Sequence, residues 1–141
     1  MKKLISMVLA ICLMCSGLLC FAHAEVEIEP RNSAYFTSYG STLSRKGDGI
    51  IKIVFSTQAT GVATTLGVAT YEVERLDSSG NWENCSGILS GKTASNVGSY
   101  TFSKYFYGIA GETYRVNATF VCAMNGGMEH KAYTSDPITA N

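Results

Sequence analysis

The chain has 141 residues, and its eleven basic side chains balance its eleven acidic ones. No block of like charge stands out, which argues against binding to nucleic acid or to an acidic membrane surface. The length is that of one ordinary domain with a single hydrophobic core.

The first 24 residues have the three parts of a secretory signal peptide. Lys2 and Lys3 come first, an apolar run follows from Leu4 to Phe21, and Ala22-His23-Ala24 places small residues at the cleavage positions. An uncleaved membrane anchor is the alternative, because an apolar run of this length can just span a bilayer. The small residues and the missing basic flank favour cleavage. We therefore expect a secreted, extracellular protein whose mature chain begins at Glu25 and has no membrane span.

Cleavage would change which residues matter. Three of the five cysteines lie in the signal peptide, so Cys85 and Cys122 remain in the mature chain. Nine basic residues then face eleven acidic ones. Aromatic residues and threonine favour strands, while frequent glycines and short polar clusters mark turns, so the composition indicates an all-β domain. Nucleotide-dependent chemistry is not expected outside the cell.

The elements begin with an extended leader at 25–33, in which charged and apolar residues alternate up to Pro30. The rest, 34–141, consists of short alternating runs separated by turn signals such as Lys46-Gly47-Asp48-Gly49. The first two runs resemble a hairpin. Together the runs predict a single antiparallel seven-stranded β-sandwich. The expected strands lie at 35–44, 50–58, 68–76, around Trp82, and at 99–107, 112–123 and 129–140.

Alternation also assigns each side chain to a face of its strand. Residues 85–97 are rich in Ser, Gly and Asn and show little pattern, so we expect a long loop there with one short strand at most. In the first strand one face is expected to carry Tyr35, Thr37, Tyr39, Ser41 and Leu43. The expected inward side chains further along are Ile51, Ile53, Phe55, Ala69, Tyr71, Val73, Tyr100, Phe102, Phe106, Tyr114, Val116, Ala118 and Phe120.

Two stretches of the chain resemble a fibronectin type III domain. Residues 71–82, which end at Trp82, resemble that fold's third strand, its turn and the Trp after it. Residues 111–118 and 135–140 resemble its sixth strand and closing hairpin. The resemblance implies an immunoglobulin or fibronectin III-like sandwich. Tyr114 begins a strand after a Gly turn, so its ring can enter the core while its hydroxyl caps a nearby backbone group.

The chain as a whole also resembles small secreted proteins of Gram-positive bacteria, which combine a signal peptide with one short domain. The shared feature is an Arg-x-Ser-x-Tyr-Phe opening, here Arg31 to Phe36. This resemblance implies bacterial export and a single domain. It assigns no activity and no catalytic residue.

Cys85 and Cys122 could form one disulfide, because exported proteins meet an oxidising environment. Closing the loop between them would stabilise the fold by roughly 4 kcal/mol in the chain-entropy model. The expected strand order argues the other way, because the third strand would lie between the two cysteines. Two ladder spacings are about 9 to 10 Å, whereas bridged α-carbons lie within about 7 Å. The sequence leaves this bridge open.

No catalytic, metal-binding or cofactor-binding motif appears in the chain. Ser90-Gly91-Lys92-Thr93 resembles the end of a phosphate-binding loop, but Ser86 occupies the position of its first glycine. His130 has no Cys or His at ligand spacing. Asp48, Glu83 and Asp136 are isolated carboxylates that charged turns explain. We therefore expect no cofactor and no enzyme activity.

Tyr105 and Tyr107 are the strongest candidates for a binding surface. Phe102 and Phe106 are expected on the inward face of the same strand, so the two tyrosines are expected to point outward. Exposed aromatic rings can stack on sugars or anchor a protein partner, and an outward Trp82 would extend the surface. The sequence favours a secreted, non-catalytic sandwich that contacts an extracellular protein or glycan. A small exported hydrolase or enzyme inhibitor, with its working residues dispersed over loops, is the alternative.

Overall fold

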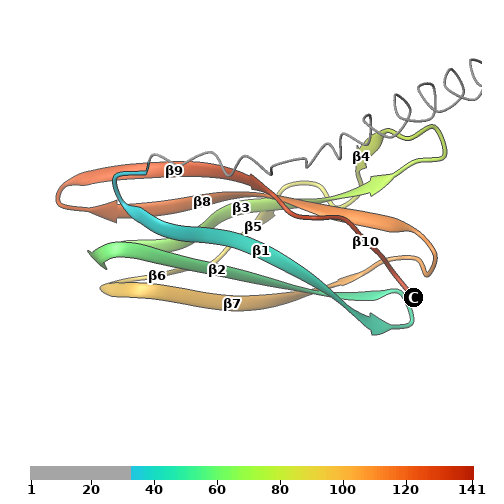
Figure 1. Ribbon diagram of the computed structural model, residues 1–141, viewed down its shortest axis with the longest axis horizontal. Coiled ribbons are helices and arrows are strands. Elements are labelled where there is room, and N and C mark those ends of the chain that lie inside the picture. Colours follow the sequence, from blue (N-terminus) through green and yellow to red (C-terminus); the bar gives the residue numbers. More distant parts are fainter. Residues whose placement is uncertain (1–32) are drawn as a thin grey trace, which may run out of the picture. The chain divides into compact units, whose positions relative to one another are not determined.

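A computed structural model describes residues 33–141 of the chain (Figure 1). The expected signal peptide at 1–24 and residues 25–32 of the expected leader lie outside these residues. From Ser33 to Asn141 every regular element is a β-strand. This described part contains no helix of the length and apolar character that a membrane span requires.

The strands between Ser33 and Asn141 form two antiparallel sheets, called sheet A and sheet B below. Sheet A has the order β1-β2-β7. Sheet B centres on the pair β3 and β8; β9 and β10 follow one another along the outer side of β8, and β4, β5 and β6 line β3. Figure 1 shows the two layers. The strands are β1 Phe36–Gly47, β2 Ile50–Ala63, β3 Thr65–Leu76, β4 Trp82–Asn84, β5 Leu89–Ser90, β6 Thr93–Ala94, β7 Val97–Tyr107, β8 Thr113–Met124, β9 Gly127–Thr134 and β10 Ile138–Thr139.

The hydrophobic core fills the space between the two sheets. Phe55 on β2 has its ring centroid 5.0 Å from that of Tyr71 on β3 and 6.4 Å from that of Phe120 on β8. Packing of this kind joins the sheets face to face in a sandwich-like all-β fold. The antiparallel pairing of β1 with β2 confirms the predicted hairpin, and the buried side chains confirm most of the predicted inward positions. The side chains at 1% exposure or less include Ile51, Ile53, Phe55, Leu66, Val68, Val73, Val116, Phe120 and Cys122.

The first strand departs from simple alternation at Thr37. Phe36 pairs with Ala59 while Ser38 pairs with Gln58, so the register shifts between them. Because a bulge adds one residue to one strand, it reverses the sides that follow. Phe36 is therefore buried and Thr37 exposed. The prediction that Thr37 shares a face with the tyrosines is wrong, whereas positions 39, 41 and 43 keep their predicted face.

The segment 85–97 contains two short strands, β5 and β6, where at most one was expected. The Gly91 N–H donates to the Ala69 carbonyl and the Val68 N–H donates to the Lys92 carbonyl, each over 2.9 Å. The chains approach so closely that a Cβ on Gly91 would lie 2.1 Å from the Val68 carbonyl oxygen. The stretch that resembles a phosphate loop is therefore a strand edge, and no helix follows it.

The last expected strand is divided into β9 and β10 at Ser135, Asp136 and Pro137. The Val116 N–H donates to Ser135 Oγ over 2.9 Å, so a side chain replaces a ladder carbonyl there. Pro137 has no N–H to donate and interrupts the pairing. Pairing resumes when Ile138 meets Tyr114.

Tyr114 joins the start of β8 to the loop before it. Its side chain is 2% exposed, and its ring lies 5.2 Å from that of Phe106 on the opposite sheet. Its Oη accepts a hydrogen bond from the Ile109 N–H over 2.8 Å. The prediction of a buried ring with a hydroxyl on nearby backbone is confirmed.

Strand β7 is an edge strand of sheet A. Lys104 on this strand pairs with Ile53, so it occupies the inward-facing side of the sheet. An inward charge on an edge strand hinders the addition of another strand, because pairing would bury that charge.

Candidate binding surfaces

Tyr105 and Tyr107 lie on the outer face of sheet A. Their exposed fractions are 55% and 76%, and they pair across the ladder with Lys52 and Ile50. Ile109, just beyond the end of β7, is 59% exposed. The structure thus places two exposed aromatic side chains and an exposed aliphatic one near the end of β7.

Trp82 belongs to the other sheet. It starts β4, pairs with Leu76, and carries the Arg115 guanidinium 4.3 Å from its ring centroid. A cation held over the indole face in this way is attracted by the ring electrons. Trp82 is half-buried and does not extend the surface of Tyr105 and Tyr107.

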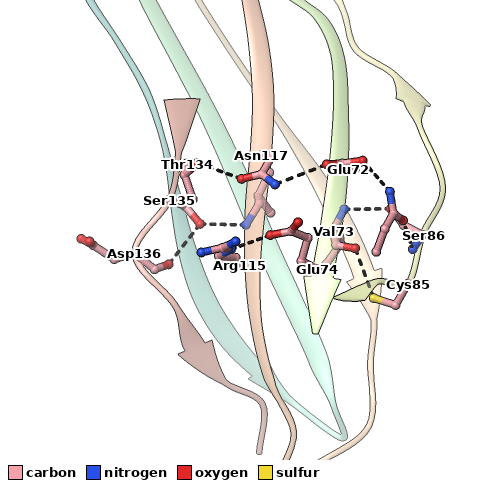
Figure 2. A network of polar contacts seen from close by, with 12 residues as sticks. Glu72, Val73, Glu74, Cys85, Ser86, Arg115, Asn117, Thr134, Ser135 and Asp136 are labelled. Carbon is pink, nitrogen blue, oxygen red and sulfur yellow. Dashed lines mark hydrogen bonds and ion pairs between the residues drawn. The ribbon is translucent and has the colours of Figure 1, made fainter. Parts of the chain in front are cut away.

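A row of polar side chains crosses the outer face of sheet B (Figure 2). Thr134 Oγ1 on β9 donates to Asn117 Oδ1 on β8 over 2.8 Å, and Asn117 Nδ2 donates to Glu72 Oε1 on β3 over 3.3 Å. Asn84 Nδ2 on β4 donates to the other oxygen of Glu72. The Ser86 N–H in turn donates to Asn84 Oδ1 over 3.1 Å. Each side chain in the row is therefore hydrogen-bonded to the next one.

An ion pair flanks this row. Arg115 Nε lies 2.5 Å from Glu74 Oε2, and only 28% and 14% of the two side chains are exposed. Beside the row the sheet is hollowed into a concavity of about 440 Å³, with the exposed side chain of Ile88 on its border. Its polar lining includes Thr70, Glu72, Arg115, Asn117, Thr119 and Thr134.

Sequence reasoning missed this row. Glu72 and Asn117 are single polar residues within strands, and neither belongs to a motif that points to a binding site. The signal was the outward parity of both residues on strands that were correctly expected. The pairing of Glu72 with Asn117 depends on the register of β3 against β8, which no local pattern specifies.

Cys85 and Cys122 are free thiols in the structure. The Cys85 N–H donates to the Val73 carbonyl, whereas Cys122 pairs with Leu66 on the other side of β3. Seven residues of strand separate those two positions, about 23 Å at the usual rise. This separation along β3 adds to the two ladder spacings, so no bridge joins them. Burial raises the pKa of both thiols, which disfavours their reactive thiolate forms.

The residues considered for catalysis are scattered. His130 lies exposed on β9, Asp48 lies in the β1–β2 turn, and Asp136 lies exposed after β9. Glu83 on β4 is 3.8 Å from Arg75. Among residues 33–141 no group of three His, Cys, Asp or Glu side chains is arranged to hold a metal ion.

Glu129 on β9 fastens the start of β1 to sheet B. Its Oε2 accepts hydrogen bonds from Ser33 Oγ over 2.8 Å and from the Tyr35 N–H over 3.1 Å. Its Oε1 lies 2.9 Å from Lys131 Nζ. Burial by itself would raise the pKa of Glu129, but the hydrogen bonds from Lys131, Ser33 and Tyr35 outweigh it and lower that pKa.

No known protein family matches the sequence, and no curated protein matches it. Among solved structures, one similar chain is described as a crystal structure of a protein from Archaeoglobus fulgidus. The similarity covers 75% of this chain and 98% of that one, with 12% identity and a TM-score of 0.37.

Proposed function

We propose that this protein is an exported, non-catalytic binding module that acts through surface contacts with an extracellular or cell-envelope partner. The observation that carries the proposal is the exposed pair Tyr105 and Tyr107 on the outer face of sheet A. Large aromatic side chains are enriched at binding hot spots, because each ring buries much area at a low cost in conformational entropy.

The fold supports the proposal. A tyrosine at the start of the sixth expected strand, with its hydroxyl on upstream backbone, is a hallmark of immunoglobulin-like sandwiches. Tyr114 and the Ile109 N–H have this arrangement. We therefore assign the sandwich to the fibronectin type III-like kind. The basic and apolar N-terminus of the sequence supports export.

The test is affinity capture with the mature chain, residues 25–141. Immobilised wild-type protein and the double variant Tyr105→Ala/Tyr107→Ala are each incubated with culture medium and with solubilised cell envelope. We expect a partner that the wild type retains and that the double variant loses by about tenfold or more, because hot-spot truncations typically cost over 1.4 kcal/mol.

The matched control is Met128→Ala, which removes an exposed apolar side chain from sheet B. It should retain the partner. Thermal unfolding must show that all variants are folded. Equal capture by the wild type and the double variant, or capture of nothing by either, contradicts the proposal.

A further inference from the structure

The outer face of sheet B has the features of a second, separate binding site. Its concavity of about 440 Å³ is lined by residues from β3, β8 and β9, and by Ile88 in the loop before β5. The volume lies within the usual range for small-molecule sites. Tyr105 and Tyr107 lie on the opposite sheet, so this site does not depend on them.

The side chains of the site are held in position before any ligand arrives. Hydrogen bonds join Thr134, Asn117 and Glu72 across three strands (Figure 2). Asn84 on β4 extends this chain to a fourth strand. Arg115 is likewise fixed between Glu74 and the Trp82 ring. Because these groups are already ordered, a ligand would not meet the entropy cost of ordering them.

The same side chains keep unused hydrogen-bonding capacity. A carboxylate has about four acceptor positions, and Glu72 uses two of them within residues 33–141. Asn117 Nδ2 has a second N–H, and the hydroxyls of Thr70 and Thr119 bind no other side chain in the described part of the chain. The concavity therefore presents acceptors, an N–H donor and hydroxyls that both donate and accept.

The charge of the site narrows the class of ligand. Arg115 is paired with Glu74, so Glu72 is the lining carboxylate without a cationic partner among residues 33–141. A phosphate, sulfate or uronate group would be repelled by it and would leave it desolvated. Neighbouring hydroxyls of a sugar instead donate to a carboxylate and accept from an amide or a hydroxyl. We infer that this face of sheet B binds a neutral carbohydrate, an uncharged oligosaccharide.

The test is a titration of the mature protein with uncharged oligomers of glucose, of mannose and of N-acetylglucosamine. Chemical-shift changes in NMR spectra measure the binding. A uronic acid oligomer and an oligolysine peptide form the charged arms. We expect saturable binding of at least one uncharged oligomer, with shifts confined to β3, β8 and β9. Glu72→Gln should weaken binding by about tenfold or more, the usual effect of losing a hydrogen bond to a charged group.

Two further variants separate loss of binding from loss of folding. Thr119→Val lies outside the hydrogen-bonded row and should also weaken binding, whereas Glu83→Gln removes a carboxylate of β4 from outside the concavity and should leave it unchanged. Failure to bind any uncharged oligomer, preference for either charged arm, or unchanged binding by Glu72→Gln and Thr119→Val would overturn the inference. If the carbohydrate inference fails, the proposed function is still supported when the variant Tyr105→Ala/Tyr107→Ala loses its partner in the separate capture experiment.

Discussion

Tyr114 shows how one side chain can connect a loop, a strand and the core. Its ring lies between the sheets, and its hydroxyl binds the Ile109 N–H, which would otherwise lack a strand partner. The preceding loop is held so closely that a Cβ on Gly108 would lie 2.8 Å from the Tyr114 ring. The tyrosine therefore fixes the path of the chain from β7 to β8.

We expect Tyr114→Phe to lower the free energy of unfolding by about 1 kcal/mol, because the ring still fills the core while the hydrogen bond is lost. Urea unfolding followed by tryptophan fluorescence measures the change. Tyr105→Phe is the matched control, since its exposed hydroxyl has no partner among residues 33–141, and it should be neutral within about 0.5 kcal/mol. A neutral Tyr114→Phe would mean that the hydroxyl bond adds no stability.

At the residue scale, the sequence predicts which side chains are buried and one local hydrogen bond, but no side-chain contact between distant strands. The alternation around Phe55 and Phe120 was enough to place both in the core, and the position of Tyr114 after a Gly turn was enough to predict its hydrogen bond. The contact between Glu72 and Asn117 could not be predicted, because it joins residues 45 positions apart through an unknown register.

At the scale of the elements, the short strands β5 and β6 lie along β3 only because the chain between them comes unusually close. Gly91 is the point of closest approach, with a Cβ position 2.1 Å from the Val68 carbonyl oxygen. A backbone atom cannot move aside as a flexible side chain can. The pairing of β5 and β6 with β3 thus requires a residue without a side chain at position 91.

We expect Gly91→Ala to destabilise the protein by about 2 kcal/mol or more, as overpacking against backbone does. Gly98→Ala is the control, because its Cβ would meet no atom closer than 3.6 Å and should cost less than about 1 kcal/mol. Chemical denaturation of both variants measures the difference. Equal losses at the two positions would contradict the close approach of 91 to β3.

The long strands were predictable because each carries its own alternation over several residues. The exceptions arise from contacts between strands. The bulge at Thr37 reflects how β1 fits against β2, and the break at Ser135 depends on its bond to Val116. Neither β5 nor β6 has a pattern of its own, since two residues are too few to alternate.

At the scale of the whole molecule, sheet A is tied to sheet B at both ends of β1. Near its start, Ser33 binds Glu129, 96 residues later in the chain. Near its end, Arg45 Nε donates to the Thr139 carbonyl over 2.6 Å. These contacts close the side of the sandwich where β1 faces β9 and β10.

The Glu129 contact makes stability depend on pH. Because the pKa of Glu129 is lowered in the folded protein, the ionised carboxylate stabilises the fold above its unfolded pKa of about 4.3, and this stabilisation is lost as pH falls through the lower folded pKa. The difference in unfolding free energy between the wild type and Glu129→Gln should be constant from about pH 7 to 5 and shrink below about 4.3.

Urea unfolding at a series of pH values measures this difference. Ser33→Ala removes one of the donors and should give a smaller loss in the same direction. A difference that is the same at about pH 3 as at pH 7 would show that the charge of Glu129 adds nothing to the contact.

The inward position of Lys104 also determines how other molecules can approach. A second copy that docked along β7 would have to strip water from an ammonium group, so growth of sheet A at its β7 edge is opposed. A molecule that contacts Tyr105 and Tyr107, as proposed above, would therefore meet the outer face of the sheet rather than pair with β7. The protein can consequently present its aromatic face at high local concentration without polymerising through that strand.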